Sequence, residues 1–248
     1  MNILQKQKLG YILTPKERRD LKFIKTKNLL EKEYNRKLTK LQVRYLERGI
    51  RKLGYWDIET KDLNPYQGCI FCFVFYTRDI LTEKVEKLAY HVSKSEVKKA
   101  YHEEEPTSNF DVDLLKKLSE CMNNCDQIVG HFSTKFDMNY FRSRCIITNQ
   151  EHLIPDYQIL TYGDTWRMMK TSLKAPRNTL NNFALQTSGK SEKTFVDLKW
   201  WNIIPLYNHK RWNEAANYIL DHCKKDVKMT YVGHKKVEPF NAISGVLV

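Results

Sequence analysis

The sequence predicts an α/β protein in which a mixed β-sheet is flanked by helices, with a basic helical extension at the N-terminus. Positive charge is concentrated in residues 1–52, which hold 16 Lys/Arg against 5 Asp/Glu. Strand-like segments begin at Gly54, and strands and helices alternate after them, which is typical of a sheet with helices packed on it. The chain of 248 residues is 42% hydrophobic and 29% charged, so a sizeable core is expected and gross disorder is not.

The extension, residues 1–52, is predicted to contain two short basic helices. "TPKE" at 14–17 and "TKLQ" at 39–42 are capping boxes, and Gly49 is expected to end the second helix. Two helices with a tight joint have the outline of a helix-turn-helix. So dense a positive charge favours a polyanion partner, most often nucleic acid. The alternative is a solvated helix pair without a partner.

The second part, residues 53–248, holds 26 Lys/Arg and 24 Asp/Glu and is nearly balanced. "YWDIET" and "CIFCFVFYT" predict neighbouring strands, separated by the turn residues of "DLNPYQG". "KLAYHVS" and "QIVGHF" predict further strands, and "LIPDYQILTYGDT" a strand with a loop. "VDLLKKLSECM" has apolar residues at helical spacing, and "FDMNYFRSRC" also reads as helical. Residues 179–187 and 213–236 are predicted to be helices.

Six cysteines raise the question of a zinc site at Cys69, Cys72, Cys121 and Cys125. The first two lie in a predicted buried strand, where residues three apart face opposite ways. Strong zinc-binding pairs sit on turns. We therefore expect reduced and mostly buried thiols.

No apolar run approaches the roughly 18 residues of a membrane helix, and the first residues lack the pattern of a secretory signal. These features predict that the protein has no membrane partner. They also predict a location in the cytoplasm, or in the host cytoplasm if the chain is encoded by a phage.

Three acidic landmarks follow one another along the second part. Asp57 and Glu59 would share one face of a strand, where two like charges repel and raise each other's pKa. Asp137 falls near the start of a helix, where a carboxylate is favourable. His222 and Asp226 are four residues apart and share a helix face. Asp137 and the pair of His222 and Asp226 each have an ordinary explanation when taken alone, whereas the repulsion between Asp57 and Glu59 needs something to offset it.

Taken together, the order and spacing of these landmarks resemble the DEDD superfamily of proofreading 3′–5′ exonucleases, which has an RNase H-like fold. The resemblance covers residues 53–236, and it depends on order and spacing because each motif is short. It implies that four carboxylates bind two divalent metal ions, Mg²⁺ or Mn²⁺, which suit oxygen ligands. By motif match the metal ligands are Asp57, Glu59, Asp137 and Asp226.

The chain departs from the family pattern at two positions. Where the family often has an asparagine in the second motif, this chain has Phe132, and the polar contact would fall to Ser133. One branch has Tyr four residues before the last aspartate and another has His five before it, whereas this chain has His222 at the four-residue spacing. His222 is the expected general base and catalytic residue, with Tyr218 as the fallback. Asp164 stands where the family has a further aspartate, and it is not counted as a ligand.

The sequence therefore predicts a metal-dependent 3′–5′ exonuclease acting on single-stranded or frayed DNA, alone or recruited by replication or repair proteins. A ribonuclease of the same fold is the first alternative, because the metal chemistry does not choose the sugar. A nucleic-acid-binding protein that has lost catalysis is the second. A transcription regulator led by the N-terminal helices would leave the acidic residues unexplained.

Overall fold

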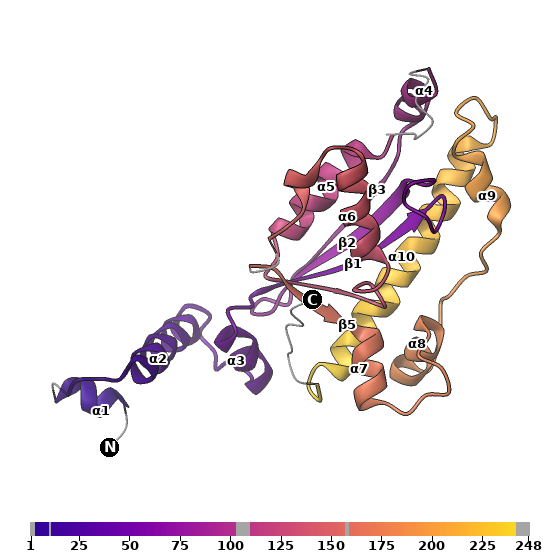
Figure 1. The fold of residues 1–248 in the computed structure, drawn as a ribbon. Coiled ribbons are helices and arrows are strands. Elements are labelled where there is room, and N and C mark those ends of the chain that lie inside the picture. Colours follow the sequence, from indigo (N-terminus) through magenta and orange to yellow (C-terminus); the bar gives the residue numbers. More distant parts are fainter. Residues whose placement is uncertain (1–2, 10, 103–109, 157–158, 242–248) are drawn as a thin grey trace. The chain divides into compact units, whose positions relative to one another are not determined.

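The computed structural model describes residues 3–9, 11–102, 110–156 and 159–241, and it divides the chain into two compact units, residues 1–50 and 51–248 (Figure 1). In the described part of the chain, no helix combines the length and the apolar character that crossing a membrane requires.

The first unit is helical. Its helices are α1 (Ile3–Lys8), α2 (Pro15–Glu33) and α3 (Lys40–Glu47). The side chains of Thr14 and Thr39 accept hydrogen bonds from the third residues of α2 and α3, and both capping boxes are complete. Gly49 follows α3 with a φ of +73°, a conformation that glycine adopts without a steric penalty. The helix α2 has 19 residues and is longer than expected, and α1 was not expected.

The second unit is built on one five-stranded sheet. Its strands are β1 (Lys52–Thr60), β2 (Ile70–Asp79), β3 (Val85–His91), β4 (Gln127–Gly130) and β5 (Thr161–Asp164). The strand order is β3-β2-β1-β4-β5. The strands β1, β2 and β3 pair antiparallel, whereas β4 and β5 continue the sheet parallel to β1. The predicted mixed sheet is confirmed. Part of the predicted segment before β5, residues 157–158, lies outside the described residues.

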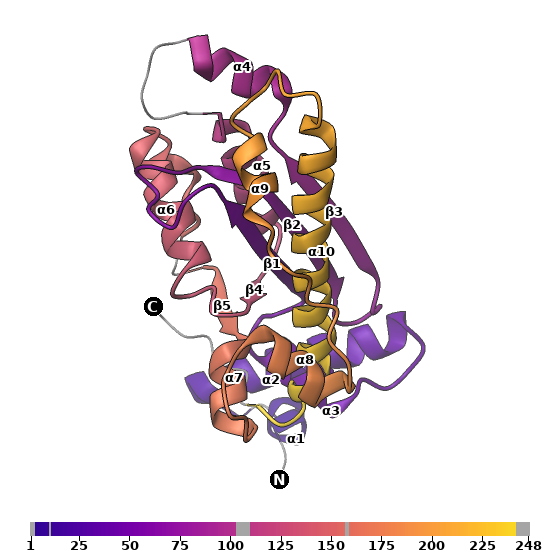
Figure 2. The ribbon, with the colours of Figure 1, turned by 90° about the vertical axis from the view of Figure 1, so that its right-hand side faces the viewer.

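Helices flank this sheet, as the fold class predicted. The described helices of the unit are α4 (Lys94–His102), α5 (Val112–Asn123), α6 (Asp137–Ile147), α7 (Thr165–Ser172), α8 (Leu180–Ser188), α9 (Leu198–Ile203) and α10 (Trp212–Val237), with a 3₁₀ turn at Glu151–Leu153. The long helix α10 runs along one face of the sheet and packs on β1, β2 and β3, while α5 packs on β2 from the other face (Figure 1, Figure 2). The arrangement is compatible with an RNase H-like fold.

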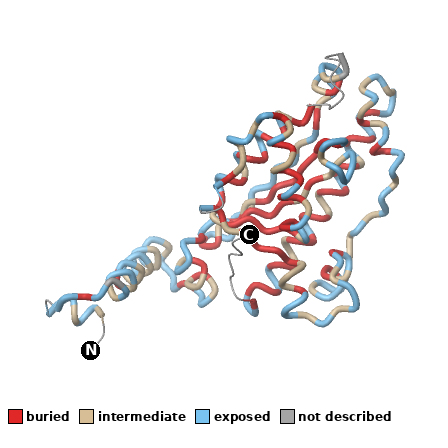
Figure 3. Tube along the Cα trace, viewed as in Figure 1, coloured by how far each residue is buried: buried red, intermediate tan, exposed pale blue. Residues whose placement is uncertain are grey.

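The core lies along the central strands, where buried residues concentrate (Figure 3). Every apolar residue from Ile70 to Phe75 is at most 1% exposed, because β2 is covered by helices on both faces. All six cysteines are free thiols, and five of them are buried. Within the described residues, no group of cysteines has the geometry of a metal site.

Candidate active site

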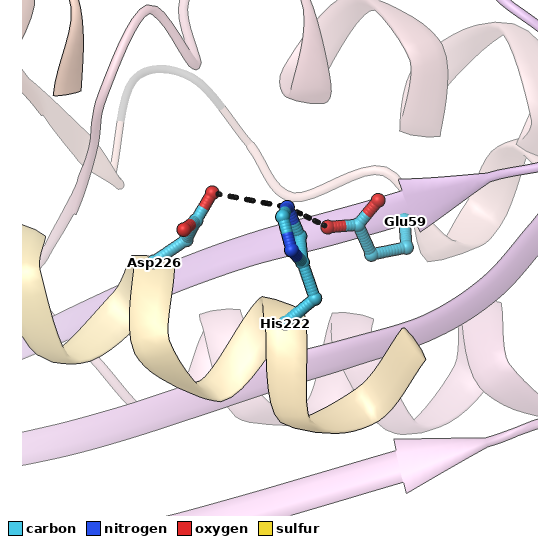
Figure 4. Close-up of side chains that lie close together, drawn as sticks. All are labelled: Glu59, His222 and Asp226. Atoms are coloured by element: carbon cyan, nitrogen blue, oxygen red, sulfur yellow. Dashed lines mark ion pairs between the residues drawn. The ribbon is translucent and has the colours of Figure 1, made fainter. Parts of the chain in front are cut away.

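The strand β1 and the helix α10 bring the first and last landmarks together. Glu59 on β1 and His222 and Asp226 on α10 point toward one another (Figure 4). His222 Nε2 lies 3.8 Å from Glu59 Oε1 and 4.0 Å from Asp226 Oδ2. Asp57, two residues before Glu59, faces α10 as well, because the Cys223 Sγ lies 3.5 Å from Asp57 Oδ2. Residues that lie far apart in the sequence thus form one cluster.

The helix α6 adds the middle landmark. Asp137 is buried at its first position, and Asp137 Oδ1 accepts a hydrogen bond of 3.3 Å from the backbone N–H of Ile58 on β1. Burial raises the pKa of Asp137 to about 7, against the lowering effect of two backbone hydrogen bonds, and the charges of Asp164 and Asp226 raise it further. Asp137 therefore belongs to the same electrostatic cluster as the residues on β1 and α10.

The surroundings of the carboxyl groups on β1 also disfavour their charged forms. Withdrawal from water raises the pKa of Asp57 well above its ordinary value, and the charges of Asp137 and Asp226 raise it further. Desolvation raises the pKa of Glu59 in the same direction, followed by the charges of Asp57 and Asp226. Burial and the charges of neighbouring carboxylates thus raise the pKa of Asp57, Glu59 and Asp137, and the charge of Asp226 contributes to all three shifts.

A loop before α9 supplies two residues that sequence reasoning missed. The Lys193 ammonium makes an ion pair with Asp226 Oδ2 and lies 3.4 Å from His222 Nε2. The Thr194 hydroxyl lies 2.6 Å from His222 Nδ1 and fixes the imidazole ring from its other side. Both lie outside the three motifs, and no periodicity or spacing marks them in the sequence.

His222 is a buried ring whose surroundings favour its neutral form. It is 3% exposed, and burial lowers its pKa below the ordinary value of a histidine. The fallback residue, Tyr218, is directed elsewhere. Its hydroxyl donates a hydrogen bond of 2.8 Å to the carbonyl of Phe195, and its ring stacks on Trp200 at a centroid distance of 5.3 Å. Of the two rings, the one at His222 faces the carboxylates.

Asp164 organises the loop between β4 and α6. Asp164 Oδ1 accepts hydrogen bonds from the backbone N–H groups of Phe132 and Trp166, and Oδ2 accepts from Thr134. Ser133 is buried against Gly130, where an added Cβ would collide with the Ser133 side chain. The Asp164 carboxylate thus holds the loop that precedes Asp137 by hydrogen bonds.

The site has the chemistry of a divalent-metal site. One ligand atom from each of Glu59, His222 and Asp226 lies within 4.8 Å of the others, the one such group in the described chain. Asp226 Oδ1 is buried with no hydrogen-bond partner among the described atoms. An unpaired buried carboxylate oxygen is costly unless a cation or a donor satisfies it. These residues therefore fit a divalent metal.

The raised pKa values predict how pH and metal act on stability. A carboxyl group with a raised folded-state pKa binds more protons when folded, so the metal-free protein loses stability as pH rises from about 4, the unfolded pKa, through the folded pKa, about 7 for Asp137. We expect Mn²⁺ to raise the melting temperature more at about pH 8 than at about pH 5, measured by scanning fluorimetry against EDTA. An equal rise at both pH values would contradict the charge coupling.

No protein-family model matches the chain, and no curated protein matches it. Among solved structures, the chain is similar to the family B DNA polymerase from the hyperthermophilic archaeon Pyrobaculum calidifontis, with 15% sequence identity and a TM-score of 0.51. The match covers 77% of this chain and 25% of the polymerase chain, so the chain spans about a quarter of that protein's length. At this identity the likeness shows the fold, and it supports the α/β architecture with a mixed sheet.

Proposed function

We propose that residues 51–248 form a metal-dependent 3′–5′ exonuclease that hydrolyses phosphodiester bonds of single-stranded or frayed DNA. The observation that carries the proposal is that Glu59, His222 and Asp226 offer ligand atoms within 4.8 Å of one another. Asp57 contacts Cys223 on the same helix, and Asp137 accepts a hydrogen bond from the backbone N–H of Ile58, between Asp57 and Glu59. A cluster whose charges repel is expected where cations and a phosphate are to be bound. The similarity to part of a DNA polymerase favours DNA as the nucleic acid.

The residues of the site have distinct roles in this proposal. Two Mg²⁺ or Mn²⁺ ions held by the four carboxylates would supply the positive charge that phosphodiester hydrolysis requires. His222 presents Nε2 to the carboxylates while Nδ1 is held by Thr194, so the neutral ring accepts the proton of the attacking water. Lys193 places an ammonium group beside the same carboxylates, where an entering phosphate would meet it.

The proposal is tested with end-labelled oligonucleotides of DNA and RNA, incubated with Mg²⁺, Mn²⁺ or EDTA. A ladder that shortens from the 3′ end of 5′-labelled DNA, only with metal, is the expected result. A ladder on RNA alone would make the protein a ribonuclease, because the carboxylates themselves do not read the sugar. Binding of both nucleic acids without cleavage would favour a protein that has lost catalysis.

The first unit is proposed to bind the nucleic-acid backbone. In α2 the cations Arg18, Lys22, Lys25 and Lys32 are exposed. Their spacing of four, three and seven residues places them along one helix face. A row of cations on one face suits successive phosphates.

Deleting residues 1–50 removes 14 Lys/Arg against 5 Asp/Glu. We expect weaker binding at low salt. The slope of log affinity against log salt should be shallower by about 0.7 for each single-strand phosphate that the first unit had neutralised. Titrations at several salt concentrations measure the slope. Cleavage at saturating substrate should persist, because all four carboxylates lie in residues 57–226. An unchanged slope would instead assign the first unit to a protein partner or to stability.

A further inference from the structure

The backbone of Phe132 adopts a conformation that bulky residues avoid. Its φ is +64°, in the left-handed region. The other described non-glycine residues with a positive φ are Asn35, Glu83 and Asn149. Asparagine tolerates this region and an aromatic residue does not, because its Cβ and ring crowd the backbone. Phe132 is therefore held against its own preference, which is typical of functional sites.

Several hydrogen bonds impose this conformation. Asp164 Oδ1 accepts from the N–H of Phe132 at 2.8 Å, and Asp164 Oδ2 accepts from the Thr134 hydroxyl at 2.7 Å. The carbonyl of Phe132 in turn accepts from the N–H groups of Lys135 and Phe136. Glycine or asparagine at position 132 would satisfy the same bonds without strain. The backbone alone does not explain a phenylalanine here.

The side chain of Phe132 is turned toward solvent beside a second aromatic ring and a cation. The residue is 42% exposed. Its ring meets Trp166 edge to face at a centroid distance of 5.4 Å, and Lys170 Nζ lies 5.4 Å from the Trp166 ring centroid. Proteins that hold single strands combine aromatic rings, on which bases stack, with cations that follow the phosphates. The three residues form such a combination, called here the aromatic platform.

The platform lies near the carboxyl ends of β1 and β4, where the acidic cluster also lies. The loop bearing Phe132 leaves the carboxyl end of β4, the parallel neighbour of β1, and leads directly to Asp137 at the start of α6. The helix α7, which carries Trp166 and Lys170, begins at Thr165, whose hydroxyl donates a hydrogen bond of 3.0 Å to the Gly130 carbonyl at the end of β4. Both parts of the platform are thus anchored at the start of the loop that leads to Asp137.

We propose that the aromatic platform stacks an unpaired nucleobase of the strand that enters the active site, with Lys170 pairing the adjacent phosphate. Phe132 is the residue that takes the base, and this need explains an aromatic side chain at a strained position. The inference rests on the proposed function for the strand's destination, but it concerns binding and not hydrolysis.

The test begins with binding in EDTA, where cleavage cannot occur, using a fluorescein-labelled oligothymidylate. Phe132→Asn should bind about 5- to 150-fold more weakly, the usual worth of one stacked base. Its melting temperature should equal or exceed that of the native protein, because asparagine relieves the strain. Phe132→Tyr should retain the affinity. Phe240→Asn is the matched control, since Phe240 is also exposed, at 81%, and lies outside the platform.

A single abasic nucleotide, moved along the oligonucleotide from its 3′ end, then identifies the stacked base. The native protein should lose affinity at one position, and Phe132→Asn should lose nothing further there. Equal abasic penalties in both proteins at every position would overturn the proposal, as would a Phe132→Asn protein that melts earlier yet binds normally. If the abasic penalty at one position depends on Phe132 but no cleavage is found, the platform proposal is retained and the nuclease proposal is rejected. If cleavage is found but no abasic penalty depends on Phe132, only the platform proposal is rejected.

Discussion

Asp57→Asn is expected to abolish metal-dependent cleavage while the protein stays folded. Asp57 is a proposed metal ligand that contacts Cys223 on α10, and the charges of Asp137 and Asp226 act on it, so the substitution removes a ligand from the proposed site. Stabilisation of developing charge by a metal is worth several kcal/mol, which corresponds to a loss of about 10³-fold or more in rate. The asparagine keeps the shape of the side chain and its contact with Cys223.

Single-turnover cleavage of end-labelled DNA measures this loss, and the melting temperature in EDTA measures folding. Without metal the variant should be at least as stable as the native protein, because the substitution relieves repulsion between like charges. Asp113→Asn is the matched control, since Asp113 is exposed on α5 and pairs only weakly with Lys116 at 3.4 Å. Normal cleavage by a well-folded Asp57→Asn protein would contradict the metal-site proposal.

The sheet was predictable because its strands carry strong local signals. The apolar run of β2 and the turn residues before it mark two strands, and the leucine spacing of α5 marks a helix. The positions of β4 beside β1 and of β5 beside β4 carry no such signal, since pairing depends on contacts distant in sequence. The short helices α7 and α9 were missed because eight and six residues are too few to establish a periodicity.

The site was predictable only as far as the motifs reach. The order of the acidic landmarks predicted a site of Asp57, Glu59, Asp137, His222 and Asp226. Of these, Glu59, His222 and Asp226 have ligand atoms within 4.8 Å of one another in the structure. Lys193 and Thr194 come from an irregular loop, whose path is set by packing and not by local preference. The strain at Phe132 was equally invisible, because the positive φ is imposed by hydrogen bonds to Asp164, 32 residues later.

His222→Ala is expected to lower the cleavage rate by about 10²- to 10⁴-fold, the usual contribution of a general base. In the native protein the rate should rise with pH as the imidazole loses its proton and should then level off. Because burial lowers the pKa of His222, this rise should be centred below about 6.5, the ordinary value. The variant should lose the rise, which rate measurements at saturating Mn²⁺ across this pH range would show.

Two measurements separate a base at His222 from the other roles that its position allows. Its Nε2 also faces Glu59 and Asp226 closely enough to bind a metal. A base leaves the Mn²⁺ concentration for half-maximal rate unchanged in His222→Ala, whereas a ligand raises it about 10-fold or more. Tyr218→Phe is the matched control: its hydroxyl bonds the Phe195 carbonyl, so the rate should hardly change. A large loss of rate in Tyr218→Phe with none in His222→Ala would make the tyrosine the general base. The loop before α9, whose Phe195 carbonyl holds the Tyr218 hydroxyl, would then have to move.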